Sequence, residues 1–174
     1  MVIGQQSPPV RFPIAPMANT YSQIYIQVVF AVQGRRSLIP TQHKEELQRY
    51  ITGIINRQEQ KLLAIHCMPD HTHLLIGLKP SQALSDLVRD IKTGSAAFVN
   101  EKRWVVGKFP WQEGFGAFSY AHSQLDAVIR YIREQESHHA GKSFREEYLE
   151  FLEKFQVSYD ERYIFKPLDE EKST

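Results

Sequence analysis

Three things are scarce in this sequence: cysteine, excess charge of one sign and long apolar runs. Cys67 is the single cysteine of the 174 residues, so no disulfide can form within the chain and a reducing compartment is expected. No apolar run approaches the roughly 20 residues of a membrane-spanning helix, and the amino terminus lacks the basic and apolar segments of a secretory signal. We therefore expect a soluble, cytoplasmic protein without membrane contact.

The formal net charge of +1 favours neither nucleic acid nor an acidic partner, so any nucleic-acid surface must come from where the basic residues lie. The length and the hydrophobic fraction of 42% are typical of one globular domain. Residues 1–16, with prolines at positions 8, 9, 13 and 16, are predicted to form a flexible leader. Residues 17–165 are the predicted domain, and residues 166–174 a solvated tail.

Apolar residues follow strand and helix periods in turn along the domain. A spacing of two predicts strands over residues 24–30, 61–68, 71–78 and 115–120. Helical spacing predicts helices over residues 47–55, 84–99, 125–132 and 144–155. The order β-α-β-β-α-β-α indicates an α+β fold, a ferredoxin-like antiparallel sheet with helices on one face.

Two histidines lie one residue apart at the start of a predicted strand. Because side chains alternate along a strand, His71 and His73 share a face, about 7 Å apart along the backbone, and can bind one divalent ion. If residues 69 and 70 form a two-residue turn, His66 lies opposite His73. We expect His66 either to contact a metal ligand without binding the ion itself or to face solvent. The same register places on the core face Leu63, Ile65, Cys67, Thr72, Leu74 and Ile76. The alternative is a surface strand that happens to carry histidines.

A later helix carries a tyrosine beside a polar stripe. Tyr131 and Gln135 are four positions apart, so they share one helix face. His138 joins that stripe and His139 lies at its edge. Both are candidates for contacting a metal ligand without binding the ion themselves. The neighbouring apolar stripe leaves Tyr131 at the margin of the core. The alternative is a tyrosine that borders the core and a solvated glutamine.

Together the two motifs resemble the single-tyrosine transposases of the HUH endonuclease superfamily. These belong to the insertion-sequence 200/605 group of bacteria and archaea and to their palindrome-associated relatives. The resemblance rests on residues 68–73 and on Tyr131 with Gln135, and it covers about residues 21 to 163. The two motifs at this separation are specific, although neither is specific alone. Thr72 departs from the pattern, because the family usually has a bulky apolar residue there.

The resemblance implies His71 and His73 as metal ligands, Gln135 as the third ligand, and Tyr131 as the nucleophile on a C-terminal helix. It implies cleavage of single-stranded DNA flanked by hairpins, with a 5′-phosphotyrosine and a free 3′-hydroxyl, so that the strand is rejoined without ATP. Mixed nitrogen and oxygen ligands suit Mg²⁺ or Mn²⁺. The resemblance also implies a homodimer, in which the helix can deliver its tyrosine to the partner's histidine pair.

Basic and aromatic residues are candidates for a DNA surface. Candidate phosphate contacts are Arg89, Lys92, Lys102, Arg103, Lys108 and Arg130. Candidate surfaces for base stacking are Trp104, Trp111, Phe115 and Phe118. For each of them the alternative is an ordinary solvated charge or a core ring.

Three other functions stay open. The chain could be a catalytically inactive or domesticated DNA-binding module of the same fold. It could be a metal hydrolase that uses His66, His71 and His73, with water as the nucleophile. It could also nick DNA in plasmid replication or conjugation, which the short chain disfavours.

Overall fold

The structure is a computed structural model, and it describes residues 21–138, 141–160 and 164. The predicted leader at 1–16, the tail at 166–174 and both predicted domain boundaries lie outside the described residues. In the part of the chain that is described, no helix combines the length and the apolar character needed to cross a bilayer.

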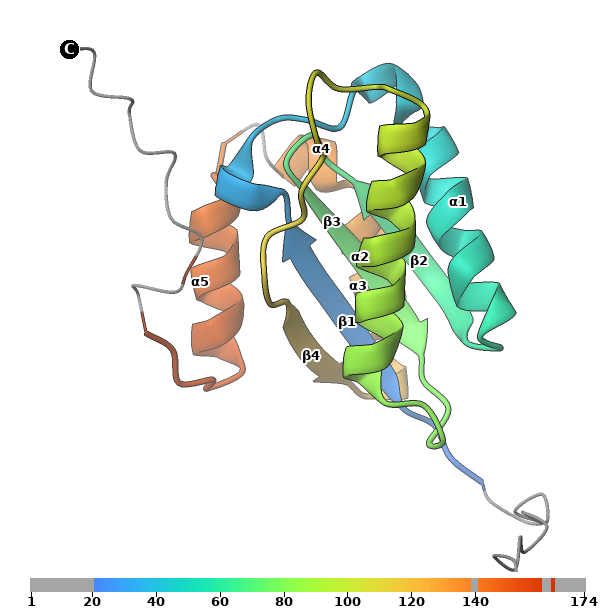
Figure 1. The fold of residues 1–174 in the computed structure, drawn as a ribbon. Coiled ribbons are helices and arrows are strands. Elements are labelled where there is room, and N and C mark those ends of the chain that lie inside the picture. The colour runs from blue at the N-terminus through green and yellow to red at the C-terminus, as the bar shows by residue number, and fades with distance from the viewer. Residues whose placement is uncertain (1–20, 139–140, 161–163, 165–174) are drawn as a thin grey trace, which may run out of the picture.

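Four antiparallel strands form one sheet in the spatial order β2-β3-β1-β4 (Figure 1). Their bounds are β1 Tyr25–Ala31, β2 Lys61–Cys67, β3 His71–Gly77 and β4 Gly116–Tyr120. The predicted strands are therefore confirmed. The central pair, β1 and β3, is almost wholly buried, which means that both faces of the sheet are covered.

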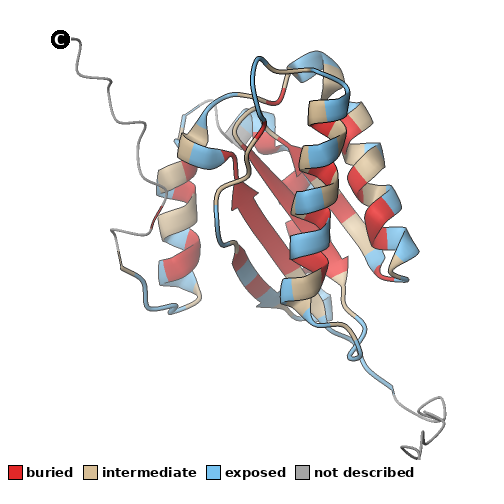
Figure 2. Cartoon of the chain, viewed as in Figure 1, coloured by how far each residue is buried: buried red, intermediate tan, exposed pale blue. Residues whose placement is uncertain are grey.

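Helices α1 (Lys44–Arg57) and α2 (Leu84–Glu101) cover one face of the sheet (Figure 1). Between helices and sheet lies the largest apolar cluster, to which β1 contributes Val28 and Phe30 and β3 contributes Leu74 and Ile76. Figure 2 shows the buried residues of both helices turned toward the strands. This layer is the one that the sequence predicts.

Helices α3 (Leu125–Arg133) and α5 (Phe144–Lys154) pack against the opposite face. They contact the alternate strand residues, which include Val29 of β1 and Leu75 of β3. The prediction of helices on one face is therefore incomplete, because strands that are apolar on both sides need two covering layers. Short connecting helices are η1 Gln33–Arg35, η2 Thr41–His43, η3 His122–Gln124 and α4 Gln135–His138.

The β2–β3 hairpin has the predicted register at its turn. His66 pairs with His73, Cys67 pairs with Thr72, and the Met68 amide donates to the His71 carbonyl at 2.8 Å. Farther from the turn a bulge between Leu62 and Ala64 shifts the register. The placement of Leu63 on the core face is consequently wrong: Leu62 packs against the core there, and Leu63 packs on the α3 side.

Candidate active site

Two histidines of β3 and one glutamate of α5 form a buried cluster. The side chains of His71, His73 and Glu147 are 1%, 0% and 5% exposed, and their ligand atoms all lie within 4.8 Å of one another. The face shared by His71 and His73 follows from strand alternation, as predicted. Two imidazole nitrogens and one carboxylate oxygen are a donor set compatible with a divalent metal.

Helix α5 brings Glu147 to this place. The helix begins after Ser143, whose hydroxyl accepts from the Glu146 amide while the Glu146 carboxylate accepts from the Ser143 amide. Phe144, Glu147 and Phe151 then occupy one buried stripe at helical spacing. The Phe144 ring stacks on the His71 imidazole with centroids 4.0 Å apart, so the helix lies directly over the histidine pair.

The Glu147 carboxylate joins the two motifs that the sequence singles out. The Tyr131 hydroxyl donates to its Oε1, and the Gln135 Nε2 donates to the same oxygen at 3.1 Å. Its other oxygen, Oε2, lies 3.5 Å from Nε2 of His73. Burial raises the pKa of Glu147 to about 7, and the neighbouring His71 imidazole opposes this only in part. The structure thus brings all four predicted site residues around one carboxylate.

The Nδ1 atom of each imidazole contacts a polar side chain. Nδ1 of His71 lies 2.7 Å from the Asp70 carboxylate, which directs Nε2 of that ring toward the cluster. Nδ1 of His73 lies 3.1 Å from the Gln27 carboxamide, which in turn accepts from the Tyr120 hydroxyl at 2.9 Å. Burial lowers the pKa of His71, and the Asp70 contact opposes this only in part, so the ring is neutral and able to ligate at pH 7.

Tyr131 is reachable from solvent. It is half-buried on α3, with its ring centroid 6.2 Å from that of His73. A pocket of about 470 Å³ lies between α3 and α5 and is lined by residues that include Tyr131 and Glu147. Ser123, Gln124 and Lys154 give the pocket polar walls. The phenol is therefore at the margin of the core, as the helical spacing predicts.

Tyr131 and Gln135 do not lie on one continuous helix, contrary to the prediction from the sequence. Helix α3 ends at Arg133, Glu134 is not helical, and the four-residue α4 begins at Gln135. The Gln135 side chain nevertheless turns back toward the tyrosine, with Nε2 3.4 Å from the Tyr131 carbonyl. Helix α5 follows, so the tyrosine does not lie on the last helix of the described chain.

The remaining histidines contribute less. His66 lies opposite His73 in the sheet, but its Nε2 is 3.9 Å from the Glu136 carboxylate, and the buried cluster contains Glu147 rather than His66. The His138 side chain and all of His139 lie outside the described residues. Their predicted supporting roles stay predictions.

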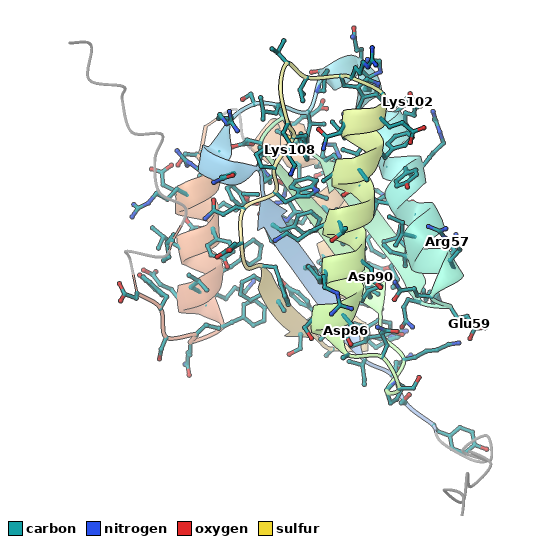
Figure 3. All side chains as sticks on the ribbon, viewed as in Figure 1. Arg57, Glu59, Asp86, Asp90, Lys102 and Lys108 are labelled. Atoms are coloured by element: carbon teal, nitrogen blue, oxygen red, sulfur yellow. The ribbon has the colours of Figure 1, made fainter. Side chains whose placement is uncertain are left out.

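The candidate DNA contacts do not form one surface. Arg89 is paired with Asp86 and Asp90, which Figure 3 shows at the opposite end of α2 from Lys102. Lys92 is partly buried and donates to the carbonyls of Gln112 and Gly114, which gives it a role in holding the loop before β4. Lys102 is exposed but paired with Glu46 at 2.9 Å. The exposed basic residues that remain are Arg103, Lys108 and Arg130.

Most of the candidate stacking rings are occupied within the protein. Phe118 is buried, and Trp111 packs edge-on against Phe30 while its indole donates to Ser95. Trp104 stacks on His43 with centroids 4.4 Å apart. For Phe118 and Trp111 the core interpretation is the correct one.

Three residues of the site were missed by the sequence analysis. Glu147 is one of six glutamates between residues 146 and 170, so nothing in the sequence distinguishes it except its position on the apolar stripe with Phe144 and Phe151. Asp70 was assigned only to the turn, although a carboxylate next to a ligand histidine is a common support. Gln27 is a polar residue in an otherwise apolar strand, which was a usable signal.

Comparison with known proteins identifies relatives that are transposases. Residues 20–135 match the family described as "Transposase IS200 like". The ISDra2 transposase TnpA of Deinococcus radiodurans is 25% identical over 120 residues, which cover 65% of this chain and 84% of that protein. A Deinococcus radiodurans crystal structure described as a transposase aligns with a TM-score of 0.52 and 20% identity over 70% of this chain and 96% of its own.

A second solved structure is a REP-associated tyrosine transposase bound to a REP hairpin. It aligns with a TM-score of 0.53 and 17% identity, over 72% of this chain and 74% of its own. At these identities the two structures support the fold.

Replacement of Glu147 by glutamine should change how stability depends on pH when a chelator is present. Since burial raises the pKa of Glu147 from 4.5 to about 7, the folded chain holds this proton more tightly than the unfolded chain. The contribution of Glu147 to the free energy of unfolding should therefore fall as pH rises through that window. Glutamine does not titrate, so wild type should lose stability relative to Glu147→Gln between these pH values in urea denaturation. A constant difference would contradict the raised pKa.

Proposed function

The chain belongs to the IS200-like family of single-tyrosine HUH transposases, and on that basis we propose that it nicks and rejoins single-stranded DNA through a covalent 5′-phosphotyrosine. The observation that carries this proposal is the convergence of Tyr131 with the buried histidine pair. The Tyr131 hydroxyl donates to Glu147, which is the third member of the buried cluster with His71 and His73. The proposed nucleophile and the proposed metal ligands thus lie around one carboxylate.

The phenol of Tyr131 is the proposed nucleophile. A phenol is a weak nucleophile at neutral pH until its proton is removed. Because the Tyr131 hydroxyl donates to Oε1 of Glu147, the proton has an acceptor already in contact. Attack of the phenolic oxygen on phosphorus breaks the bond to the 3′ oxygen, which leaves as a free hydroxyl. The phosphodiester energy is kept in the tyrosine ester, so rejoining needs no ATP.

His71 and His73 are the proposed metal ligands, and the family resemblance assigns the Gln135 carboxamide oxygen as a third. The contacts of the two rings with Asp70 and Gln27 fix which nitrogen of each ring faces the cluster with Glu147. A divalent ion such as Mg²⁺ or Mn²⁺, when bound, polarises the scissile phosphate and offsets its developing charge.

DNA with a hairpin is the proposed substrate. One solved relative is described as bound to a REP hairpin, and the pocket between α3 and α5 offers a flexible single strand a route to Tyr131. Among the predicted phosphate contacts we retain the exposed Arg103, Lys108 and Arg130. Arg89, Lys92 and Lys102 are weaker candidates, since each has a partner within the protein.

Tyr131→Phe should abolish the covalent protein–DNA species without preventing DNA binding, because it removes only the nucleophilic oxygen. The measurement is incubation of labelled single-stranded hairpin DNA with Mn²⁺, followed by denaturing gel electrophoresis. The matched control is Tyr50→Phe, whose ring stacks on Phe98 on the far side of the sheet and should keep full adduct formation.

Two other outcomes of this hairpin-DNA assay would each support a rival function. Cleavage that persists in Tyr131→Phe, with no adduct in wild type, would indicate a metal hydrolase with a water nucleophile. Hairpin binding by wild type with neither cleavage nor adduct would indicate an inactive DNA-binding module.

The resemblance also implies a homodimer, and we propose that each subunit uses its own tyrosine. The support is that Tyr131 lies beside the histidine pair of the same chain, with its ring centroid 6.2 Å from that of His73. A mixture of Tyr131→Phe and His73→Ala, co-refolded to allow subunit exchange, should therefore form no adduct. Recovery of adduct in the mixture would instead show that the tyrosine acts on the histidines of the other subunit.

A further inference from the structure

We propose that Glu147 is itself a ligand of the metal, through its Oε2, so that α5 is a structural part of the metal centre. This inference rests on the proposed function, because it concerns the same ion. It adds a carboxylate ligand from a helix that follows the two motifs in the chain.

The geometry of the cluster carries the inference. The ligand atoms of His71, His73 and Glu147 lie within 4.8 Å of one another, close enough for all three to reach one ion. Oε2 of Glu147 is 3.5 Å from Nε2 of His73, the nitrogen that faces away from Gln27. The two oxygens of the carboxylate divide their roles, since Oε1 accepts from Tyr131 and Gln135 while Oε2 faces the histidine.

The burial of this carboxylate supports the same role. Glu147 is 5% exposed, and a buried carboxylate needs compensating donors or a cation; Tyr131 and Gln135 supply donors to Oε1, and a cation on the Oε2 side would add to them. Mg²⁺ and Mn²⁺ prefer oxygen ligands, and an anionic oxygen supplies charge that two neutral imidazoles and a carboxamide lack. A carboxylate in this position therefore suits the ion better than the predicted ligands do by themselves.

Helix α5 is held firmly enough to present a ligand. Phe151 stacks on Phe118 of β4 with centroids 5.0 Å apart. Gly116 allows Tyr148 to approach the sheet, because a Cβ at that position would lie 2.7 Å from the ring. The helix also lies beyond residues 20–135, the part of the chain that matches the family. The family motifs therefore do not account for Glu147.

Gln135 and Glu147 are compatible as ligands. In the structure the Gln135 Nε2 donates to Glu147, which holds the carboxylate in place. A six-coordinate ion accepts two imidazoles, one carboxylate and one carboxamide and still has positions for phosphate oxygens.

The test is titration of the folded protein with Mn²⁺ alone, in the absence of DNA, by isothermal calorimetry and by the loss of the free Mn²⁺ electron paramagnetic resonance signal. Glu147→Gln should weaken Mn²⁺ binding by at least about tenfold, since changes near a bound metal commonly cost that much or more. Glu153→Gln makes the same change of charge on the exposed side of α5 and should leave the affinity within about twofold of wild type.

Three results would overturn the proposal. Binding by Glu147→Gln equal to wild type would exclude Glu147 as a ligand and leave the proposed function intact. An equal loss in Glu147→Gln and Glu153→Gln would reveal a general charge effect. Absence of Mn²⁺ binding by wild type would overturn the metal centre of the proposed function as well.

A folding control accompanies the titration. Thermal unfolding in chelator checks that Glu147→Gln is folded. If Glu147→Gln does not fold, Glu147→Asp replaces it. This substitution keeps the charge but shortens the side chain by one methylene, so it should also weaken Mn²⁺ binding at least about tenfold. Wild-type affinity in Glu147→Asp would then count against the proposal.

Discussion

The contacts of the Glu147 carboxylate connect three separate parts of the chain: a strand with two histidines, a helix with a tyrosine, and the helix that bears the glutamate itself. Without α5 the histidine face of β3 would be open to solvent above His71, whose ring stacks on Phe144. Burial of the carboxylate is unfavourable unless donors or a cation compensate it. The site is therefore assembled by tertiary packing of α5 rather than by either motif alone.

The two faces of the sheet differ in what they bury. On one face, α1 and α2 bury a continuous apolar cluster that includes Phe30 and Ile76. On the other face, α3 and α5 cover strands that carry polar residues among apolar ones, including Gln27 and His73. One face thus carries the largest apolar cluster, and the other buries the histidine pair beside Tyr131 and Glu147, which line the pocket between α3 and α5.

Local patterns were enough to predict the strands, the long helices and the hairpin register that pairs His66 with His73, because period and turn chemistry are local properties. The bulge at Leu63 was missed since alternation alone does not reveal an extra residue. Glu147 could not be selected either, because only the docking of α5 distinguishes it from the neighbouring glutamates. The placement of Tyr131 at the core margin was predicted, while its contact with a carboxylate was not.

The central claim is that one divalent ion sits among the imidazoles of β3 and the carboxylate of α5, beside the phenol of Tyr131. The most direct measurement is a crystal structure of the wild-type protein with Mn²⁺, with anomalous data collected near the manganese absorption edge. The account predicts one anomalous peak within ligand distance, about 2.0–2.4 Å, of His71, His73 and Glu147. A peak elsewhere, or well-ordered crystals in which Glu147 faces away from a bound ion, would contradict it.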